Sequence, residues 1–334
     1  MTLAFVALGL DHRHIYSMTE NMQAVGARCL GFWTDGTPQP LDGYRKRFPD
    51  LHRFDTLDAA LAAGADLALV SAIPADRAAL AIRAMHSGHD VMTDKPGCTD
   101  TDQLAVIKAA VAETGRIWSI NFSERFEVPA VTMADQLVQE GAIGRVVHTT
   151  GLGPHRLNRA TRPDWFFDRT RYGGVLTDIA SHQIDQFLHF TGSDMAEVTM
   201  AHVANHTNRD DPGLQDFGEL SLRSDHASGY IRVDWYTPDA LPNWGDGRLT
   251  LLGTDGYIEL RKYVDVGGRA GADHLVLVNG TRCENIDARG AGLPYFARLA
   301  HDIAHRTETA MTQSHCFAVM ELALQAQAMA EASQ

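Results

Sequence analysis

The 334-residue sequence predicts an α/β protein, with a doubly wound parallel sheet first and an α+β domain with a large mixed or antiparallel sheet after it. The length is too great for one ordinary core and suits two domains. Apolar runs alternate with helical segments up to residue 121, which is the pattern of a parallel sheet. Beyond residue 145, strand-like runs follow one another without helices, which favours an antiparallel or mixed sheet.

In the first part, segments with helical periodicity and capping residues separate the apolar runs. Thr56 or Asp55 suits an N-cap, and Gly88 and Gly115 stand where helices should end. Ligands of such sheets bind beyond the carboxyl ends of the strands. The predicted strands are residues 3–9, 27–33, 66–71, 89–93 and 117–121, and the predicted helices are residues 15–25, 56–63, 76–87 and 99–114.

The second part begins with a predicted helix over 129–140, and Pro294 opens a helical tail that we expect to pack back on the first domain. Many turns between the strand-like runs contain Gly, Asp or Asn. The predicted division of the chain is residues 1–121, 122–293 and 294–334. The strand-like runs cover residues 145–152, 197–205, 215–223, 228–236, 247–252, 256–263 and 274–279.

Composition argues against several classes of partner. The formal net charge of −13 disfavours a surface for nucleic acid or anionic membranes, since both require clustered Lys and Arg. No apolar run approaches about 20 residues, so no membrane-spanning helix is predicted. The four cysteines are scattered without metal or redox spacing, which favours a reduced, cytoplasmic setting.

Three predicted strand ends carry candidate functional residues. The first keeps only Gly9 of the Gly-x-Gly-x-x-Gly dinucleotide fingerprint, with His12 in place of its third glycine. The second ends in Asp35, which suits the ribose hydroxyls of NAD rather than NADP, although an Asp-Gly turn competes strongly as an explanation. The third is Asp94-Lys95-Pro96, which places an amine at the ligand edge for proton transfer or for steadying an alkoxide. A surface lysine in a turn is the alternative.

The segment from Gly173 to Asp185 combines two glycines with a helical run. Asp178, His182 and Asp185 stand at i, i+4 and i+7 and should share one helix face. A carboxylate one turn before an imidazole can orient it and raise its basicity. The alternative is a half-exposed helix with a surface histidine, in which Asp185 caps or pairs within the helix.

Residues 153–172 are dense in Arg, Pro and aromatic residues, and irregular segments of this length are often functional. Trp165 could stack on a sugar face, and arginines such as Arg156 could grip hydroxyls or a carboxylate. Phe166 and Phe167 suit core positions better. Loop arginines, however, more often meet backbone carbonyls or solvent.

Taken together, these motifs resemble the glucose–fructose oxidoreductase / inositol dehydrogenase (Gfo/Idh/MocA) family. Asp94-Lys95-Pro96 is similar to that family's (Glu/Asp)-Lys-Pro motif. The segment 173–185 is similar to its Gly-Gly-x-Leu-x-Asp-x-x-x-His-x-x-Asp motif. Segments 84–91, 121–126 and 143–146 extend the resemblance over roughly the whole chain.

The resemblance implies a Rossmann domain, a mixed-sheet substrate domain, and NAD-dependent oxidation of a hydroxyl of a sugar, cyclitol or sugar acid. Lys95, Asp178 and His182 match the family's catalytic residues. His182 would be the base, Lys95 would stabilise the alkoxide, and Asp178 would orient the substrate or His182, while the Lys and His roles could be exchanged. The expected substrate contacts are Lys95, Arg156, Trp165, Asp178 and His182. The expected cofactor contacts are Gly9, Leu10, Asp11, His12, Asp35, Ser71, Ile73, Pro74, Asp94, Lys95, Pro96 and Asn121.

The loop from Leu10 to His14 departs from the family pattern, because the bulky His12 replaces a glycine that allows close approach of a pyrophosphate. We favour NAD binding with a displaced loop, in which His12 or Arg13 contacts the phosphate or the nicotinamide side. Alternatively, Asp11, His12 and His14, with His155 or His182, could bind a transition metal. A closely spaced trio in a turn rarely has that geometry, so no metal is predicted.

Two further functions stay open. The protein could be a sugar or NAD sensor without catalysis, although retention of Lys95, Asp178 and His182 argues against this. It could also use bound NAD in a redox-neutral cycle, such as glycoside cleavage or epimerisation. The exposed face of a large mixed sheet would be an apolar patch that needs cover, which favours a homodimer or homotetramer.

Overall fold

The computed structural model describes residues 2–333, so residues 1 and 334, at the outer ends of the predicted segments, lie outside the described range. The chain forms two compact units and returns to each of them, whereas the predicted division into 1–121, 122–293 and 294–334 assumes consecutive segments. The first unit comprises Met1–Asn121, Pro163–Gly173 and Pro294–Met320, and the second comprises Phe122–Arg162, Gly174–Leu293 and Glu321–Gln334.

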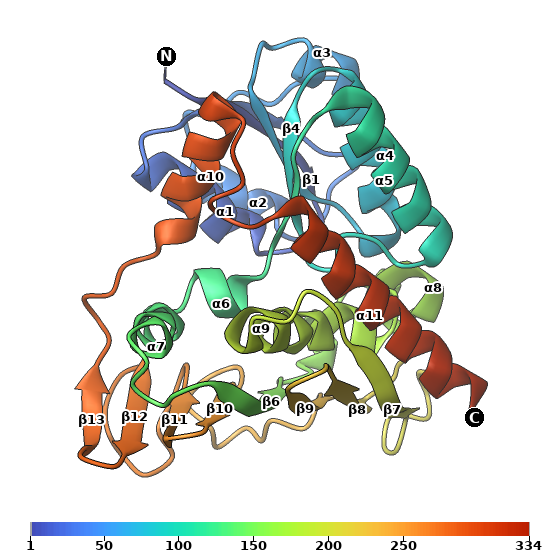
Figure 1. The fold of residues 1–334 in the computed structure, drawn as a ribbon. Coiled ribbons are helices and arrows are strands. Elements are labelled where there is room, and N and C mark those ends of the chain that lie inside the picture. The colour runs from blue at the N-terminus through green and yellow to red at the C-terminus, as the bar shows by residue number, and fades with distance from the viewer. Residues whose placement is uncertain (1, 334) are drawn as a thin grey trace. The chain divides into compact units, whose positions relative to one another are not determined.

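The first unit contains a five-stranded parallel sheet with the order β2-β1-β3-β4-β5 (Figure 1). All of these strands except β2 are buried throughout, as expected of a parallel sheet with both faces covered. The order confirms the predicted doubly wound sheet and places a topological switch point between β1 and β3. The strands are β1 (Ala4–Leu10), β2 (Arg28–Trp33), β3 (Leu67–Ser71), β4 (Asp90–Asp94) and β5 (Trp118–Asn121).

Helices connect these strands, and several of their ends follow the sequence signals. Thr56 Oγ1 accepts a hydrogen bond from the Ala59 amide at 3.1 Å, and Asp100 Oδ1 accepts one from the Gln103 amide at 2.8 Å. Gly115 ends the last of them with φ 63°, a left-handed conformation that suits glycine. The helices are α1 (Ile15–Ala24), the unpredicted α2 (Leu41–Arg47), α3 (Leu57–Leu61), α4 (Pro74–His86) and α5 (Thr101–Thr114).

Later segments complete the first unit. The hydroxyls of Tyr295 and Ser119 share a hydrogen bond of 2.6 Å, which ties α10 to β5. The Gln313 side chain bonds the backbone N–H and C=O of Trp118, both at 2.9 Å, and so ties the start of α11 to the same strand. These segments include η2 (Asp164–Phe167), α8 (Arg169–Tyr172), α10 (Pro294–His305) and the first part of α11 (Gln313–Ala332).

The second unit contains an eight-stranded mixed sheet with the order β13-β12-β11-β10-β6-β9-β8-β7. β6 and β9 run parallel, and the other described neighbours run antiparallel. The predicted mixed sheet is confirmed, and β13 is a strand beyond those predicted. The strands are β6 (Val146–Pro154), β7 (Glu197–Ala204), β8 (Phe217–Arg223), β9 (Ser228–Asp234), β10 (Arg248–Gly253), β11 (Gly256–Arg261), β12 (His274–Asn279) and β13 (Cys283–Asp287).

Helices cover one face of this sheet, which we call the inner face; in Figure 1, α7 and α9 lie on it. Alternate strand residues such as Leu249 and Leu251 are buried there in a core that includes Val131 of α7. Gly151 and Gly153 of β6 leave room for the Gln183 side chain of α9. The other residues of each strand point to the opposite, outer face. The helical segments of this unit are α6 (Ser123–Phe126), α7 (Pro129–Gln139), η1 (Arg159–Thr161), η3 (Leu176–Ala180), α9 (Ser181–Thr191) and the end of α11.

The predicted regular helix after Gly174 needs a correction. Leu176–Ala180 forms a π-helix, and α9 begins only at Ser181. A π turn holds an extra residue, so Asp178 and His182 do not simply stand one α-helical turn apart. Separately, no helix among residues 2–333 has the length and apolarity needed to cross a bilayer.

Candidate active site

The turn after β1 is fixed at the switch point of the parallel sheet. Gly9 has φ +70°, and a Cβ at this position would lie 2.6 Å from the Cβ of Ala72, so a side chain cannot replace it. The amides of Asp11 and His12 both donate to the Ser71 carbonyl, at 3.0 and 3.1 Å. The one glycine of the fingerprint that remains therefore allows the turn after β1 to pack closely against the end of β3.

Asp94, at the end of β4, joins three side chains in what we call the Asp94 cluster (Asp94, His12, His14 and Arg77). Its Oδ2 lies 2.7 Å from His12 Nδ1, and its Oδ1 lies 2.8 Å from His14 Nδ1. Arg77 Nη2 donates to Oδ2 at 3.0 Å. Although burial alone would raise it, the Arg77 guanidinium and the two imidazoles hold the pKa of Asp94 well below its usual range.

The ionised carboxylate decides the tautomers of both histidines. Because it can only accept hydrogen bonds, His12 and His14 donate from Nδ1. Burial lowers the pKa of His12 to about 4, against the attraction of Asp94, so this imidazole is neutral at pH 7 and its Nε2 is a lone-pair acceptor. The rings of His12 and His14 pack edge to face, with centroids 4.4 Å apart.

The alternative metal site would consist of other residues than the sequence suggested. The structure brings Asp94, rather than Asp11, to the two histidines, with one donor atom from each of the three residues inside a 4.8 Å span. Their hydrogen bonds and the Arg77 cation already satisfy the carboxylate. The chemistry of this donor set therefore favours a hydrogen-bonded cluster over a metal centre.

Lys95 follows the cluster directly and is 5% exposed. Arg77, fully buried on α4, donates to the carbonyl oxygens of Asp94 and Pro96 at 3.0 Å each, and also to that of Lys95. The guanidinium thus holds the backbone on both sides of the amine, and the Lys95–Pro96 peptide bond is cis. The sequence pattern missed Arg77, because an arginine in an alanine-rich amphipathic helix reads as a surface residue.

Asp11 differs electrostatically from Asp94. Burial raises its pKa to about 6, although the Arg77 charge opposes this. The carboxyl therefore titrates just below neutral pH, beside the turn that replaces the glycine fingerprint.

The other predicted cofactor contacts lie at or near the ends of the same strands. Asp35 is exposed just beyond β2, and the neighbouring Thr34 Oγ1 accepts a hydrogen bond from the Leu10 amide at 3.1 Å. Arg53, which the sequence pattern did not single out, donates to the Gly36 carbonyl at 3.1 Å. This guanidinium stands beside the loop of Asp35. Ser71 and Asn121 are buried strand ends, and Ile73 and Pro74 form the N-terminus of α4.

In the second unit, paired glycines lead into the π-helix. Gly174 has φ +89°, and a Cβ there would collide with the Gln327 side chain. The amides of Val175 and Leu176 donate to the side-chain oxygens of Gln215 and Gln327, both at 3.0 Å. These side chains thus accept hydrogen bonds from the first backbone N–H groups of the helical segment, which otherwise have no partner within the helix and no conventional N-cap residue.

Asp178 and His182 are both buried, at 9% and 2% exposure. The His182 ring packs edge to face with Phe122, at a centroid distance of 6.3 Å. Asp185 forms a bidentate ion pair with Arg125 of α6, at 2.7 and 2.5 Å, which explains this residue without a catalytic role. The combined placement of Lys95 with Asp178 and His182 stays a prediction.

The two predicted substrate contacts from residues 153–172 are engaged differently. Arg156 Nη2 donates to the carbonyls of Pro238 and Leu241, at 2.8 and 2.6 Å, and so braces the loop after β9. Trp165 lies in η2 and packs against Phe166, with ring centroids 6.1 Å apart. Phe166 is buried, as expected for a core aromatic. Substrate contact by Arg156 and Trp165 stays a prediction.

Comparison with known proteins gives three main findings. The family model for the GFO/IDH/MocA C-terminal domain matches residues 131–259. A solved structure from Erwinia carotovora atroseptica, assigned provisionally to the oxidoreductases, is 42% identical, with a TM-score of 0.95 over 98% of this chain and 99% of that one. Levoglucosan dehydrogenase of Pseudarthrobacter phenanthrenivorans is 30% identical over 118 residues, which are 34% of this chain and 30% of that relative.

The fold extends to more distant structures. A levoglucosan dehydrogenase in complex with NADH and levoglucosan superposes with a TM-score of 0.80 at 17% identity, covering 100% of this chain and 98% of that one. Such low identity establishes a common fold only. The full-length match at 42% identity, together with the matched family domain, establishes more: the chain belongs to the Gfo/Idh/MocA family of oxidoreductases.

Proposed function

We propose that this oxidoreductase is an NAD-dependent dehydrogenase that oxidises a hydroxyl group of a sugar, cyclitol or sugar acid. The observation that carries the proposal is the buried Lys95, held by Arg77 and the Asp94 cluster at the carboxyl edge of the parallel sheet. Lysines are seldom buried this fully, and active sites are where buried ionisable groups are concentrated.

The first unit fits a nicotinamide dinucleotide. The Gly9 turn brings the backbone against Ala72 at the switch point, and the N-terminus of α1, which attracts anions, follows it. The exposed Arg13 supplies a cation for the pyrophosphate. We expect the remaining cofactor contacts from Leu10, Asp11, His12, Ser71, Ile73, Pro74, Asp94, Pro96 and Asn121.

Preference for NAD rests on Asp35, which suits the ribose hydroxyls and repels a 2′-phosphate. Arg53 beside the same loop introduces a counter-effect, because a guanidinium can pair with that phosphate. We therefore expect NAD to bind more tightly than NADP, and we expect Arg53→Ala to widen the difference.

Bound nicotinamide would supply the hydride acceptor. His182 takes the proton from the substrate hydroxyl, and the Lys95 ammonium donates a hydrogen bond to the oxygen as negative charge develops on it. Asp178 orients the substrate or His182. The proton and the hydride leave the same carbinol group, so the product is a ketone or a lactone.

Fluorescence titration of dialysed protein with NAD and with NADP tests the proposal. Binding of NAD in the micromolar range supports a dehydrogenase, and failure of both cofactors to bind contradicts it. A panel of sugars, cyclitols and sugar acids at alkaline pH then follows NADH formation by absorbance. Tight NAD binding with no NADH released by any substrate would favour a redox-neutral enzyme, and cofactor binding without any conversion would favour a sensor.

A further inference from the structure

A buried ion pair in the second unit has no part in the proposed reaction. Lys262, which follows β11, is 1% exposed, and Glu124 of α6 is 2% exposed. Lys262 Nζ donates to Glu124 Oε2 at 2.6 Å and to Gln186 Oε1 of α9 at 3.0 Å. Gln183 Nε2 of α9 donates to the same Glu124 oxygen at 2.9 Å. We call these four residues, Lys262, Glu124, Gln183 and Gln186, the Lys262 network.

The network lies on the inner face of the mixed sheet. Ile258 and Leu260 of β11 are buried in the inner core, and the alternation of side chains along the strand places Lys262 on the same face. The backbone N–H of Lys262 donates to the carbonyl of Gly247, the residue before β10, at 2.9 Å. The lysine is therefore held by the sheet, and its ammonium group reaches from the sheet to the two helices.

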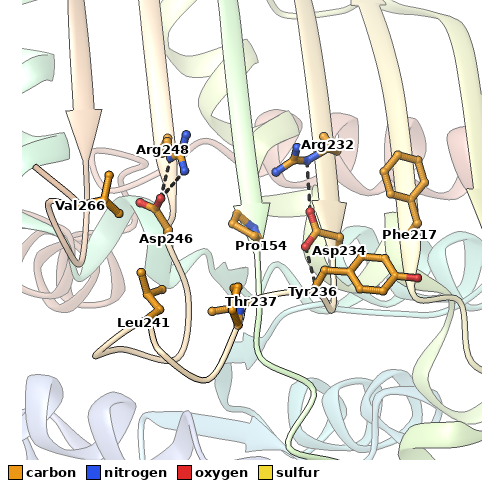
Figure 2. Close-up of a pocket in the computed structure, with 11 residues that line it drawn as sticks. Pro154, Phe217, Arg232, Asp234, Tyr236, Thr237, Leu241, Asp246, Arg248 and Val266 are labelled. Atoms are coloured by element: carbon orange, nitrogen blue, oxygen red, sulfur yellow. Dashed lines mark hydrogen bonds and ion pairs between the residues drawn. The ribbon is translucent and has the colours of Figure 1, made fainter. Parts of the chain in front are cut away.

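The burial of this ion pair is unusual for a charged pair. On the outer face of the same sheet, Figure 2 shows Arg232 beside Asp234, and the side chain of this arginine is 38% exposed. Lys262 and Glu124, by contrast, have lost nearly all contact with water. The desolvation of two charges often costs more than their attraction returns, so apolar residues of similar volume are often as stable or more stable. Stability alone therefore does not explain this pair.

Three further polar atoms of the network support the same conclusion. Glu124 Oε1, Gln183 Oε1 and Gln186 Nε2 are buried and have no hydrogen-bond partner within residues 2–333. A buried polar network that is only partly satisfied is less favourable than an apolar core of the same shape. Directional polar contacts can instead provide specificity, because they fix one arrangement of the elements that they join.

Helix α9 is the element that the network joins to the sheet and to α6. Gln183 and Gln186 stand at i and i+3, so they lie on one side of the helix. His182 directly precedes the first of these glutamines in sequence. α6 packs against α9 (Figure 1), and the Arg125–Asp185 ion pair joins the same two helices. A rotation of α9 about its axis would break the hydrogen bonds of both glutamines.

Such a rotation would displace His182. Side chains extend about 5–6 Å from the axis of a helix, so a rotation of about 10° moves a side-chain tip by about 1 Å. A displacement of about 1 Å in the geometry of a reacting group can lower a rate about a hundredfold. The His182 ring also packs against Phe122, the residue that directly precedes α6, so both helices bear on the orientation of this imidazole.

We propose that Lys262 and Glu124 are positioning residues, which fix the rotation of α9 and thereby the orientation of the His182 imidazole. They act through Gln183 and Gln186. The orientation of His182 follows from the network itself, whereas an effect on turnover rests on the proposed dehydrogenase function. The two consequences are therefore measured separately.

The double variant Glu124→Gln/Lys262→Met tests the proposal. It removes both charges at nearly constant volume and keeps an amide oxygen that accepts from Gln183, so its melting temperature should stay within a few degrees of the wild type. Lys262→Met alone would leave Glu124 buried without its cation and should be much less stable. The matched control, Asp287→Asn/Arg289→Met, removes an exposed ion pair of the same unit.

The first readout requires no substrate. In protein with isotope-labelled histidine, the loss of one imidazole signal in His182→Gln identifies the signal of His182. This signal should shift or broaden in the double variant and stay unchanged in the control. A crystal structure of the double variant should show α9 rotated about its axis. An unchanged His182 signal together with an unrotated α9 would overturn the proposal.

Turnover with NAD and the fastest of glucose, myo-inositol and gluconate is the second readout. The double variant should lose at least about tenfold in kcat, while KM and NAD affinity change less than about threefold, because the fault lies in the reacting geometry. A fall in kcat that only matches a loss of folded protein would overturn the proposal. A displaced His182 with an unchanged kcat would support the positioning and contradict His182 as the base in the proposed function.

Discussion

Lys95 is the residue on which the proposed chemistry depends most directly. Lys95 is buried, and the backbone carbonyls of residues 94–96 accept hydrogen bonds from Arg77, so a fully buried guanidinium holds the backbone at this position. Such a fixed geometry is what proton transfer and alkoxide stabilisation require.

We expect Lys95→Ala to abolish turnover, with a loss of at least about a thousandfold, because the alkoxide loses its hydrogen-bond donor. Cofactor affinity should change less than about threefold. Steady-state rates and NAD titration measure the two effects separately. The exposed Lys46→Ala on α2 is the control and should keep full activity. An active Lys95→Ala enzyme would remove the residue from the mechanism.

His12 makes stability depend on pH in a defined direction. Its pKa falls from 6.5 to about 4 in the folded protein, so the unfolded chain binds more protons between these values and stability falls as pH drops from 6.5 towards 4. The raised pKa of Asp11 has the opposite effect on the stability of the protein. Because the folded state binds more protons at Asp11 between pH 3.8 and about 6, this contribution to stability falls as the pH rises through that range.

Replacing His12 isolates its contribution to the pH dependence of stability. Between pH 8 and pH 5, the free energy of unfolding of the wild type should fall by up to about 2 kcal/mol more than that of His12→Asn, as proton linkage requires. The 23% exposure of the imidazole makes the expected difference smaller than this upper value. Urea unfolding at pH 8, 6.5 and 5 measures this, and each protein's own value at pH 8 is the reference. Parallel pH profiles for the two proteins would contradict the prediction.

At the scale of elements, the π-helix η3 is the feature that the sequence did not reveal. The spacing of Asp178, His182 and Asp185 fits an α-helix, because a π turn leaves no separate mark in apolar periodicity. Capping residues and glycines, by contrast, located the ends of α3 and α5, because caps are local and carry their own chemistry. Short segments such as α2 lie below the length at which periodicity is informative.

Gly174 allows the entry to η3. An alanine there would require a left-handed conformation, and its Cβ would collide with the Gln327 side chain, which is held by hydrogen bonds to Leu176, Gln215 and Glu331. We expect Gly174→Ala to cost about 1–3 kcal/mol and to lower the melting temperature by several degrees. Gly280→Ala, in open space at an ordinary φ, is the matched control and should have little effect. Equal melting temperatures for the two variants would contradict this account.

At the scale of the whole molecule, the fold was predictable because alternation of strands and helices extends over many residues. The candidate site was predictable only in part. Asp94 lies 82 residues from His12 and 80 residues from His14 along the chain, and only the carboxyl edge of the parallel sheet brings them together. Arg77 and Arg53 were missed because most of their partners are backbone carbonyls, which leave no trace in sequence.

The outer face of the mixed sheet bears on assembly. It was expected to be apolar, yet its exposed Leu252 and Tyr257 alternate with charged groups such as Arg232 and Glu259. We still expect a homodimer or homotetramer, with polar pairs contributing across a large interface. Size-exclusion chromatography with light scattering decides this, and a monomer at micromolar concentration would contradict it. Leu252→Glu should weaken the assembly if this face is used.

The Asp94 cluster has an evolutionary consequence. One carboxylate serves two imidazoles and a guanidinium, so substitutions at these four positions are epistatic and their effects should not add. A glycine at position 12 alone would leave Asp94 short of a donor and His14 without its neighbour. A lineage could therefore exchange this loop for the conventional fingerprint only by passing through poorer intermediates, or by changing several positions at once.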